Sequence, residues 1–160
     1  MSKLDISFFK DNYVFTKKYG DAFAIKGIDL DLQAGDLFGF IGPNGAGKST
    51  TMKLLTGFLA ATKGTVAIAD HDMQKNRIQG SEHIGYLPEH NPLYLDMYVK
   101  EYLSFIAGIH MQASKVRARV KEMVDITGLG REQKKKSGAL SKGYRQRVGL
   151  AQAMIHNPEV

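Results

Sequence analysis

The chain changes its hydrophobic pattern part-way along its length, from strand-like to helical. Apolar and polar residues alternate from Ala24 to Leu32, which predicts a strand with one buried face. Apolar or β-prone stretches predict three further strands, at residues 37–41, 65–69 and 84–87. Pro88 ends the last of these, and turns are expected at residues 34–36 and 63–64. A short helix is expected after residue 47, with Gly57 as its stop.

After Pro88 the apolar residues recur with the spacing of an α-helix. One apolar face is expected from Tyr98, Val99, Tyr102, Leu103, Ile106 and Ile109. A second helix that ends at Gly128 would present Val116, Val120, Met123 and Val124. Strand-rich sequence is therefore followed by a helical block.

The segment between the 37–41 strand and the short helix matches the phosphate-binding pattern G-x-x-x-x-G-K-[ST] at every fixed position. Its residues are Gly42, Pro43, Asn44, Gly45, Ala46, Gly47, Lys48, Ser49 and Thr50. Gly42, Gly45 and Gly47 lack a Cβ, so the backbone can adopt positive φ and turn successive N–H groups toward an anion. The positive end of the following helix points at the same place.

The three residues after Gly47 complete the expected binding site. Lys48 is expected to reach the β- and γ-phosphates, and Ser49 to give its hydroxyl to Mg²⁺. Thr50 would add a donor to the α-phosphate. The expected ligand is a nucleoside triphosphate with Mg²⁺.

Composition excludes several other classes of site. The 160 residues contain no cysteine, so disulfides, thiolate metal sites and a cysteine nucleophile are ruled out. The five histidines have no metal-binding spacing, and no apolar run approaches the ~20 residues of a membrane span, so a cytoplasmic protein is expected. The net charge is +6, but its residues are spread out, and the run Lys134 to Lys136 is interpreted as a solvated turn. No nucleic-acid partner is expected, while weak attraction to acidic lipids stays open.

A second motif follows the helical block, in the sequence from Leu140 to Val148. Taken alone, Ser141 would be the N-cap of an Arg-rich amphipathic helix. Together with the phosphate-binding loop, the segment resembles the ATP-binding subunit of ABC transporters, whose signature reads Leu-Ser-Gly-Gly-Gln before an Arg-Gln-Arg helix. The resemblance runs from about Tyr13 to the last residue.

This resemblance implies an α/β fold: a P-loop NTPase core of the ABC ATPase type with an inserted helical subdomain. The core would comprise about residues 1–90 and 140–160, and the subdomain about 91–139. The implied function is ATP hydrolysis coupled to export by a membrane permease, at the inner face of the cell membrane. Ser141, Lys142 and Gly143 would act in trans, facing the ATP held by a second ATP-binding subunit in a head-to-tail dimer.

Two further positions follow from the resemblance. Tyr19 resembles the aromatic residue that stacks on adenine, although an ordinary tyrosine at a strand end remains possible, and Tyr13 and Phe15 offer the same chemistry. Glu89 stands where the family has the glutamine that links Mg²⁺ and the attacking water to the permease. A glutamate there still offers an oxygen ligand but adds a negative charge.

The signature departs from the family pattern, because Lys142 replaces its first glycine and Tyr144 its glutamine. Leu-Ser-Lys-Gly together with Leu-Pro-Glu resembles the two-component exporter branch that includes the ATPases of bacterial gliding motility.

Residues 155–160 resemble the approach to the Walker B strand, and the sequence stops before the family's Mg²⁺-binding Asp, catalytic Glu and switch His. We therefore expect the C-terminal part of the core to be missing, and the chain alone to bind nucleotide, to hydrolyse none and to be poorly soluble. The alternatives are an inactive nucleotide-binding fragment and a soluble ABC ATPase that acts on DNA or ribosomes.

Overall fold

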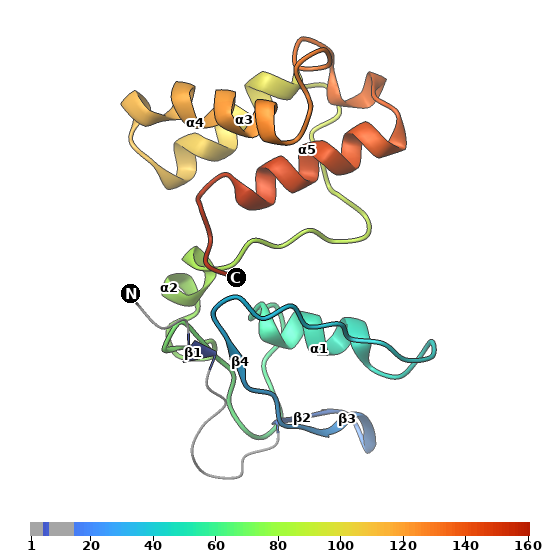
Figure 1. The fold of residues 1–160 in the computed structure, drawn as a ribbon. Helices are drawn as coiled ribbons and strands as arrows, with labels where there is room; N and C mark the ends of the chain where they lie inside the picture. Colours follow the sequence, from blue (N-terminus) through green and yellow to red (C-terminus); the bar gives the residue numbers. More distant parts are fainter. Residues whose placement is uncertain (1–4, 7–14) are drawn as a thin grey trace. The chain divides into compact units, whose positions relative to one another are not determined.

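The computed structural model describes residues 5–6 and 15–160, which form two compact units (Figure 1). The first unit contains the residues up to Ile84 together with Glu159, and the second contains Gly85 to Pro158 together with Val160. Each unit has its own cluster of buried apolar side chains. Tyr13, an alternative adenine-stacking residue, lies outside the described residues.

The first unit begins with a hairpin of β2 (Phe15–Tyr19) and β3 (Ala22–Ile28), which pair antiparallel. The strand predicted from Ala24 to Leu32 is therefore only partly correct. After Ile28 the chain leaves the hairpin, and β4 (Leu32–Gln33) pairs instead with β1 (Asp5–Ile6). Alternation alone does not show such a change of pairing partner.

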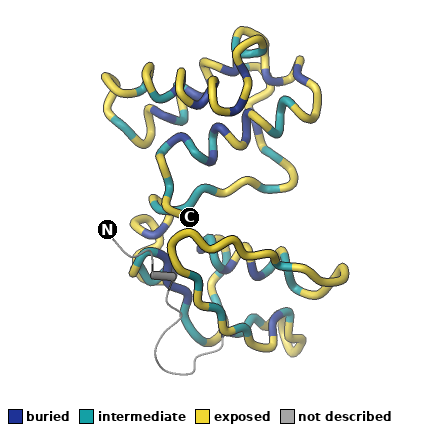
Figure 2. The backbone as a smooth tube through the Cα atoms, in the orientation of Figure 1, coloured by how far each residue is buried: buried dark blue, intermediate teal, exposed yellow. Residues whose placement is uncertain are grey.

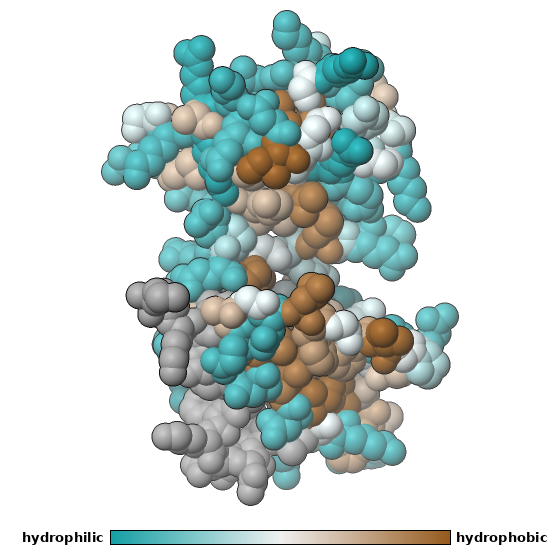
Figure 3. Space-filling view, viewed as in Figure 1, coloured by the Kyte–Doolittle hydropathy of each residue, from teal (hydrophilic) through white to brown (hydrophobic). Residues whose placement is uncertain are grey.

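The strand predicted at residues 37–41 is not formed. Its residues have no regular secondary structure, and Leu37 and Ile41 are almost fully exposed. A strand requires a neighbouring strand to pair its N–H and C=O groups, and no described segment pairs with this one. Figure 2 shows the result as a long exposed stretch between β4 and the helix α1, and Figure 3 shows hydrophobic side chains on the surface of the first unit.

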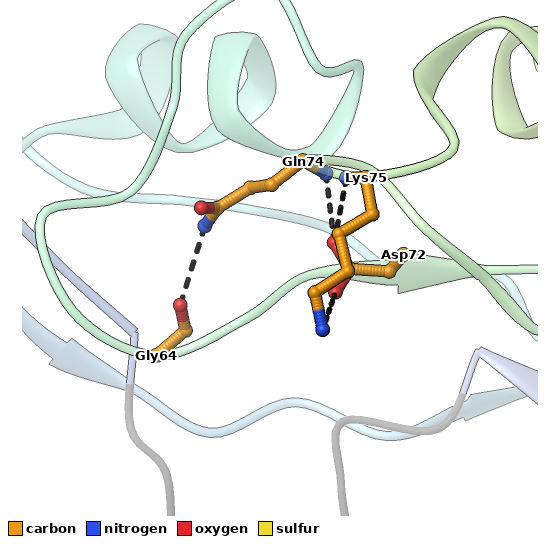
Figure 4. A network of polar contacts seen from close by, with 4 residues as sticks. All are labelled: Gly64, Asp72, Gln74 and Lys75. Atoms are coloured by element: carbon orange, nitrogen blue, oxygen red, sulfur yellow. Dashed lines mark hydrogen bonds and ion pairs between the residues drawn. The ribbon is translucent and has the colours of Figure 1, made fainter.

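The predicted strand at 65–69 is shorter than expected, because only β5 (Ala67–Ile68) pairs, with β6 (His71–Asp72). The turn between them places Ala69 and Asp70 at φ 47° and 63°, the left-handed region that suits a tight hairpin. The carboxylate of Asp72 then accepts hydrogen bonds from the main-chain N–H groups of Gln74 and Lys75 (Figure 4). The side-chain amide of Gln74 reaches the Gly64 carbonyl oxygen in the predicted 63–64 turn, where Gly64 has φ 79°.

Two helices complete the first unit. The predicted short helix is α1 (Lys48–Leu55), and Gly57 ends it with φ 68° as expected. The helix α2 (Arg77–Glu82) had no sequence prediction. The buried cluster of this unit consists of Phe15, Ile25, Leu54, Val66, Ile68 and Met73.

The strand predicted at residues 84–87 is also absent, for the same physical reason as the 37–41 strand. Gly85 donates one main-chain hydrogen bond, to the Val160 oxygen at 2.7 Å, and no ladder follows. Glu159 pairs with His83 through a side-chain contact of 3.0 Å. The main-chain N–H of Glu159 also donates to the His83 oxygen at 3.0 Å, but two isolated hydrogen bonds to the final residues do not make a strand.

The second unit is helical and contains α3 (Val99–His110), α4 (Ala113–Ile126), the 3₁₀ turn η1 (Ser137–Ala139) and α5 (Lys142–Met154). The predicted apolar faces are confirmed for most residues, since those of both helices enter one core. Tyr98 and Ile109 were wrongly placed, because both are exposed. The predicted stop at Gly128 is confirmed by its φ of 66° after the end of α4.

A partly buried hydrogen bond joins α3 to α5. The hydroxyl of Tyr102 donates to Oε1 of Gln152 at 2.6 Å, while its ring meets Tyr94 edge-on. Burial raises the pKa of Tyr102 to about 12, and the neighbouring Tyr94 adds to this shift. The side chain is therefore a neutral hydrogen-bond donor at physiological pH. Over the described part of the chain, no helix has the length and apolarity needed to cross a bilayer.

Candidate nucleotide-binding site

The loop from Gly42 to Thr50 ends on α1 and is held by its own main chain. The N–H of Ala46 donates to the Pro43 oxygen at 3.3 Å, which closes a turn across Asn44 and Gly45. The positive φ predicted for the loop glycines is confirmed at Gly45, with 83°, and at Gly47, with 88°. It is wrong for Gly42, which does not have a left-handed backbone. Two of the three glycines therefore supply the conformation that an anion-binding nest requires.

Gly47 is also required because the loop approaches β3 closely. A Cβ on Gly47 would lie 2.7 Å from the carbonyl oxygen of Ala24 and 3.5 Å from Ile25. Backbone oxygen at that distance cannot move aside as a flexible side chain could. The close approach therefore packs the start of α1 directly against the β2–β3 hairpin.

The side chain of Lys48 folds back over the loop. Its Nζ donates hydrogen bonds to the Gly42 oxygen at 2.6 Å and to the Pro43 oxygen at 2.7 Å. The ammonium group is thus held at the start of the loop, near the N-terminal end of α1. A positive charge and a helix N-terminus meet there, which is the arrangement that phosphate groups prefer.

The next three residues differ in their surroundings. Ser49 is exposed and Thr50 is half-buried. Thr51, which the sequence prediction did not include, is completely buried and donates through its hydroxyl to the Gly47 oxygen at 3.0 Å. It anchors the first turn of α1, and its position four residues after Gly47 could have indicated this role.

Tyr19 ends β2, and 54% of its surface is exposed. The Nζ of Lys17 lies 5.4 Å from the centroid of its ring and donates to the Ala60 oxygen at 2.8 Å. Phe15, the alternative stacking residue, is completely buried and has no exposed ring face. Tyr19 therefore offers an accessible ring on the hairpin that contacts Gly47.

Glu89 belongs to the second unit, in a segment without regular structure. Its side chain is exposed, and its main-chain oxygen accepts a hydrogen bond from Nε2 of Gln146 at 3.1 Å. Nearby, Nδ2 of Asn91 donates to the Arg145 oxygen at 3.0 Å. A Cβ on Gly149 would clash with the Asn91 amide and lie 2.7 Å from Leu87. These contacts, which the sequence prediction missed, fix the Glu89 segment against α5.

The signature segment forms the N-terminus of α5. Ser141 is the N-cap, and its Oγ accepts a hydrogen bond from the Tyr144 N–H at 3.4 Å. Lys142 and Gly143 are exposed, and a Cβ on Gly143 would meet open space. Arg145 donates through Nε to the Leu140 oxygen at 3.0 Å, which ties the residue before the cap to the helix. The α5 N-terminus is therefore ordered and open to solvent.

Comparison with known proteins agrees with this geometry. The family model described as "ABC transporter" matches residues 25–160. The chain belongs to the ABC transporter ATP-binding family. Among its curated relatives, the chain is 34% identical over 148 residues to the bacitracin transport ATP-binding protein BcrA of Bacillus licheniformis. It is 32% identical over 145 residues to the Nod factor export ATP-binding protein I of Burkholderia lata.

These alignments cover 91% and 90% of the chain but 47% and 48% of the two relatives, so the chain spans about half of their length. Among solved structures, cbiO1 of Clostridium perfringens, described as part of the ABC transporter complex cbiONQ, matches with a TM-score of 0.79 at 26% identity. That match covers 91% of the chain and 61% of cbiO1. The predicted fold class, an α/β P-loop core of the ABC ATPase type with a helical subdomain, is confirmed.

Proposed function

We propose that this chain is the ATP-binding part of an ABC exporter, in which Mg²⁺-ATP binding and hydrolysis drive export by a membrane permease. The observation that carries the proposal is the Lys48 ammonium, held by the Gly42 and Pro43 carbonyl oxygens over a loop with two left-handed glycines. This arrangement fits a triphosphate, because the cation and the loop N–H groups serve the same anion.

Each residue of the loop has a distinct proposed role. Lys48 would exchange the loop carbonyls for β- and γ-phosphate oxygens, and the exposed Ser49 hydroxyl would serve Mg²⁺. Thr50 would donate to the α-phosphate. Tyr19, with its exposed ring, would stack on the base. Glu89 would provide an oxygen near the Mg²⁺, and its added charge favours retention of the metal.

The second part of the proposal concerns the partners. The exposed α5 N-terminus, with Ser141, Lys142 and Gly143, suits contact with the γ-phosphate of ATP held by a second ATP-binding subunit. Two such subunits in a head-to-tail dimer would act on a permease at the cytoplasmic face of the membrane. The Leu140 to Gly143 and Leu87 to Glu89 sequences support the exporter branch that includes the gliding-motility ATPases.

The deciding experiment is purification of the tagged chain from its own cells, with identification of what accompanies it. Recovery from the membrane fraction with a permease, in an ATP-dependent manner, is the expected result. Recovery from the soluble fraction with DNA or ribosomes would support the alternative of a non-transport ABC ATPase. The remaining alternative is an inactive nucleotide-binding fragment. It would be supported if the cells contain the polypeptide in this form and it binds ATP without hydrolysing it.

A further inference from the structure

We propose that the second unit carries a separate binding site for a phosphate-bearing anion, in a hollow between α3, α4 and the segment after α4. The hollow has a volume of about 640 Å³. Its polar lining consists of Lys100, Ser114, Arg117, Lys121, Asp125 and Gln133. This site is distinct from the Gly42 to Thr50 loop, and the inference does not depend on the proposed transport function.

The lining of the hollow has an excess of positive charge. Three cations, Lys100, Arg117 and Lys121, share the hollow with one carboxylate, Asp125. Within the described ranges, none of these three cations forms an ion pair. Like charges gathered around one concave surface repel each other, and an anion placed among them removes that repulsion.

Two cations of the same unit that lie outside the hollow form ion pairs. Arg119 pairs with Glu122 at 2.8 Å, and Lys135 pairs with Glu132 at 2.8 Å. The Arg119 guanidinium also donates to the main-chain oxygens of Met154 and Ile155. Those basic groups serve the fold, whereas the three cations of the hollow have no such role in the described structure.

The hollow is built from fixed elements. Arg117 and Lys121 are four residues apart on α4 and therefore share one face of the helix. Lys100 lies in the first turn of α3, and its N–H donates to the Gln133 oxygen at 3.2 Å. The buried Val120 and Val124 contribute the apolar part of the lining. Packing of both helices on the core thus keeps the three cations around one space.

The chemistry indicates the class of ligand. A guanidinium binds two phosphate oxygens at once, and two ammonium groups add point charges. The carboxylate of Asp125 lowers the net positive charge of the hollow and so weakens, without cancelling, its attraction for a phosphate anion. The volume lies within the roughly 300–1,000 Å³ of small-molecule sites. A soluble phosphate compound and a phospholipid headgroup share this chemistry.

The test measures retention of radiolabelled pyrophosphate by equilibrium dialysis, in a Lys48→Ala background that removes the first loop's contribution. One double variant carries Arg117→Gln and Lys121→Gln. The control double variant carries Lys115→Gln and Lys134→Gln. The second pair removes the same charge from exposed residues of the same unit outside the hollow. A parallel flotation assay uses phosphatidylglycerol vesicles, with phosphatidylcholine vesicles as the reference. Circular dichroism checks that each variant is folded.

We expect the Arg117→Gln, Lys121→Gln variant to bind pyrophosphate or phosphatidylglycerol vesicles at least tenfold more weakly than the Lys48→Ala background. The matched control should stay within about twofold of that background. Asp125→Asn should bind pyrophosphate more tightly. A loss confined to pyrophosphate assigns a soluble phosphate, and a loss confined to vesicles assigns a lipid headgroup. Equal losses in both double variants, or no binding in either assay, would overturn the proposal.

Discussion

The side-chain amide of Asn91 donates a hydrogen bond to the main-chain oxygen of Arg145 at 3.0 Å, which joins the Glu89 segment to α5. Gln146 reinforces the contact through the Glu89 oxygen at 3.1 Å. The segment can approach so closely because Gly149 has no side chain. These hydrogen bonds therefore hold the Glu89 segment against α5 within the second unit.

Gly149→Ala should disturb this connection. The new methyl group would meet the Asn91 amide and Leu87, so we expect a loss of about 1–3 kcal/mol in the free energy of unfolding. Gly108→Ala is the matched control, because a Cβ there meets open space on α3 and should stabilise by about 0.5–1 kcal/mol. Urea denaturation followed by circular dichroism measures both. Equal effects of the two substitutions would contradict the close packing.

Lys48→Ala should abolish ATP binding or weaken it at least about tenfold, because a cation that faces two phosphates is lost. Lys53→Ala, which removes an equal charge from the last turn of the same helix, should leave binding nearly unchanged. Titration with a fluorescent ATP analogue distinguishes them. The phosphate-loop assignment is wrong if the Lys48 variant binds as the unaltered chain does.

Tyr19→Ala should weaken ATP binding by about 1 kcal/mol, whereas Tyr19→Phe and Tyr19→Trp should be tolerated, because stacking requires a ring and not a hydroxyl. Phe23→Ala serves as the control, since Phe23 is an exposed ring on the same hairpin. Competition titrations give the affinities, and GTP should compete about as well as ATP. Unchanged affinity in the alanine variant would move the stacking role to Tyr13.

Tyr102→Phe should lower the free energy of unfolding by about 1 kcal/mol at neutral pH, because it removes the hydrogen bond to Gln152. The pKa of Tyr102 is about 12 when folded and about 10 when unfolded. The stabilising contribution is therefore complete below pH 10 and is lost as the pH rises from about 10 to 12. The phenylalanine variant should show a smaller loss over that interval in denaturation measured against pH. An identical alkaline loss in both proteins would contradict the assignment.

Leu37→Ser combined with Ile41→Ser should reduce concentration-dependent self-association. The 37–41 segment exposes apolar side chains and unpaired main-chain groups, a combination that favours edge-to-edge pairing. Ile78→Ser combined with Phe58→Ser removes similarly exposed apolar side chains elsewhere in the same unit and is the control. Sedimentation velocity at increasing concentration compares the variants. If the unaltered chain stays monomeric at high concentration, the 37–41 segment does not cause self-association.

The parts of the fold that the sequence predicted correctly depend on local rules. Helix α4 follows from the spacing of Val120, Met123 and Val124, and its end follows from Gly128, whose positive φ needs no distant partner. The loop glycines Gly45 and Gly47 are recognisable for the same reason.

The strands were predicted less well because a strand depends on its neighbours. The 37–41 and 84–87 segments have strand-like composition, but no described strand pairs with them. Likewise, nothing in the sequence around Asn91 indicates that its amide meets a carbonyl 54 residues later. The buried hydroxyl of Thr51 was overlooked because the motif directs attention to the two residues before it.

The two hydrogen bonds of Lys48 have a thermodynamic consequence for any anion that enters the loop. Since the ammonium already has carbonyl acceptors at 2.6 and 2.7 Å, a phosphate must displace them, so binding exchanges one set of acceptors for another. The enthalpy gained at this lysine is then only the difference between the two sets. Selectivity at this lysine would accordingly come from the charge of the competing ligand, because neutral carbonyl oxygens yield to an anion and hold their place against an uncharged molecule.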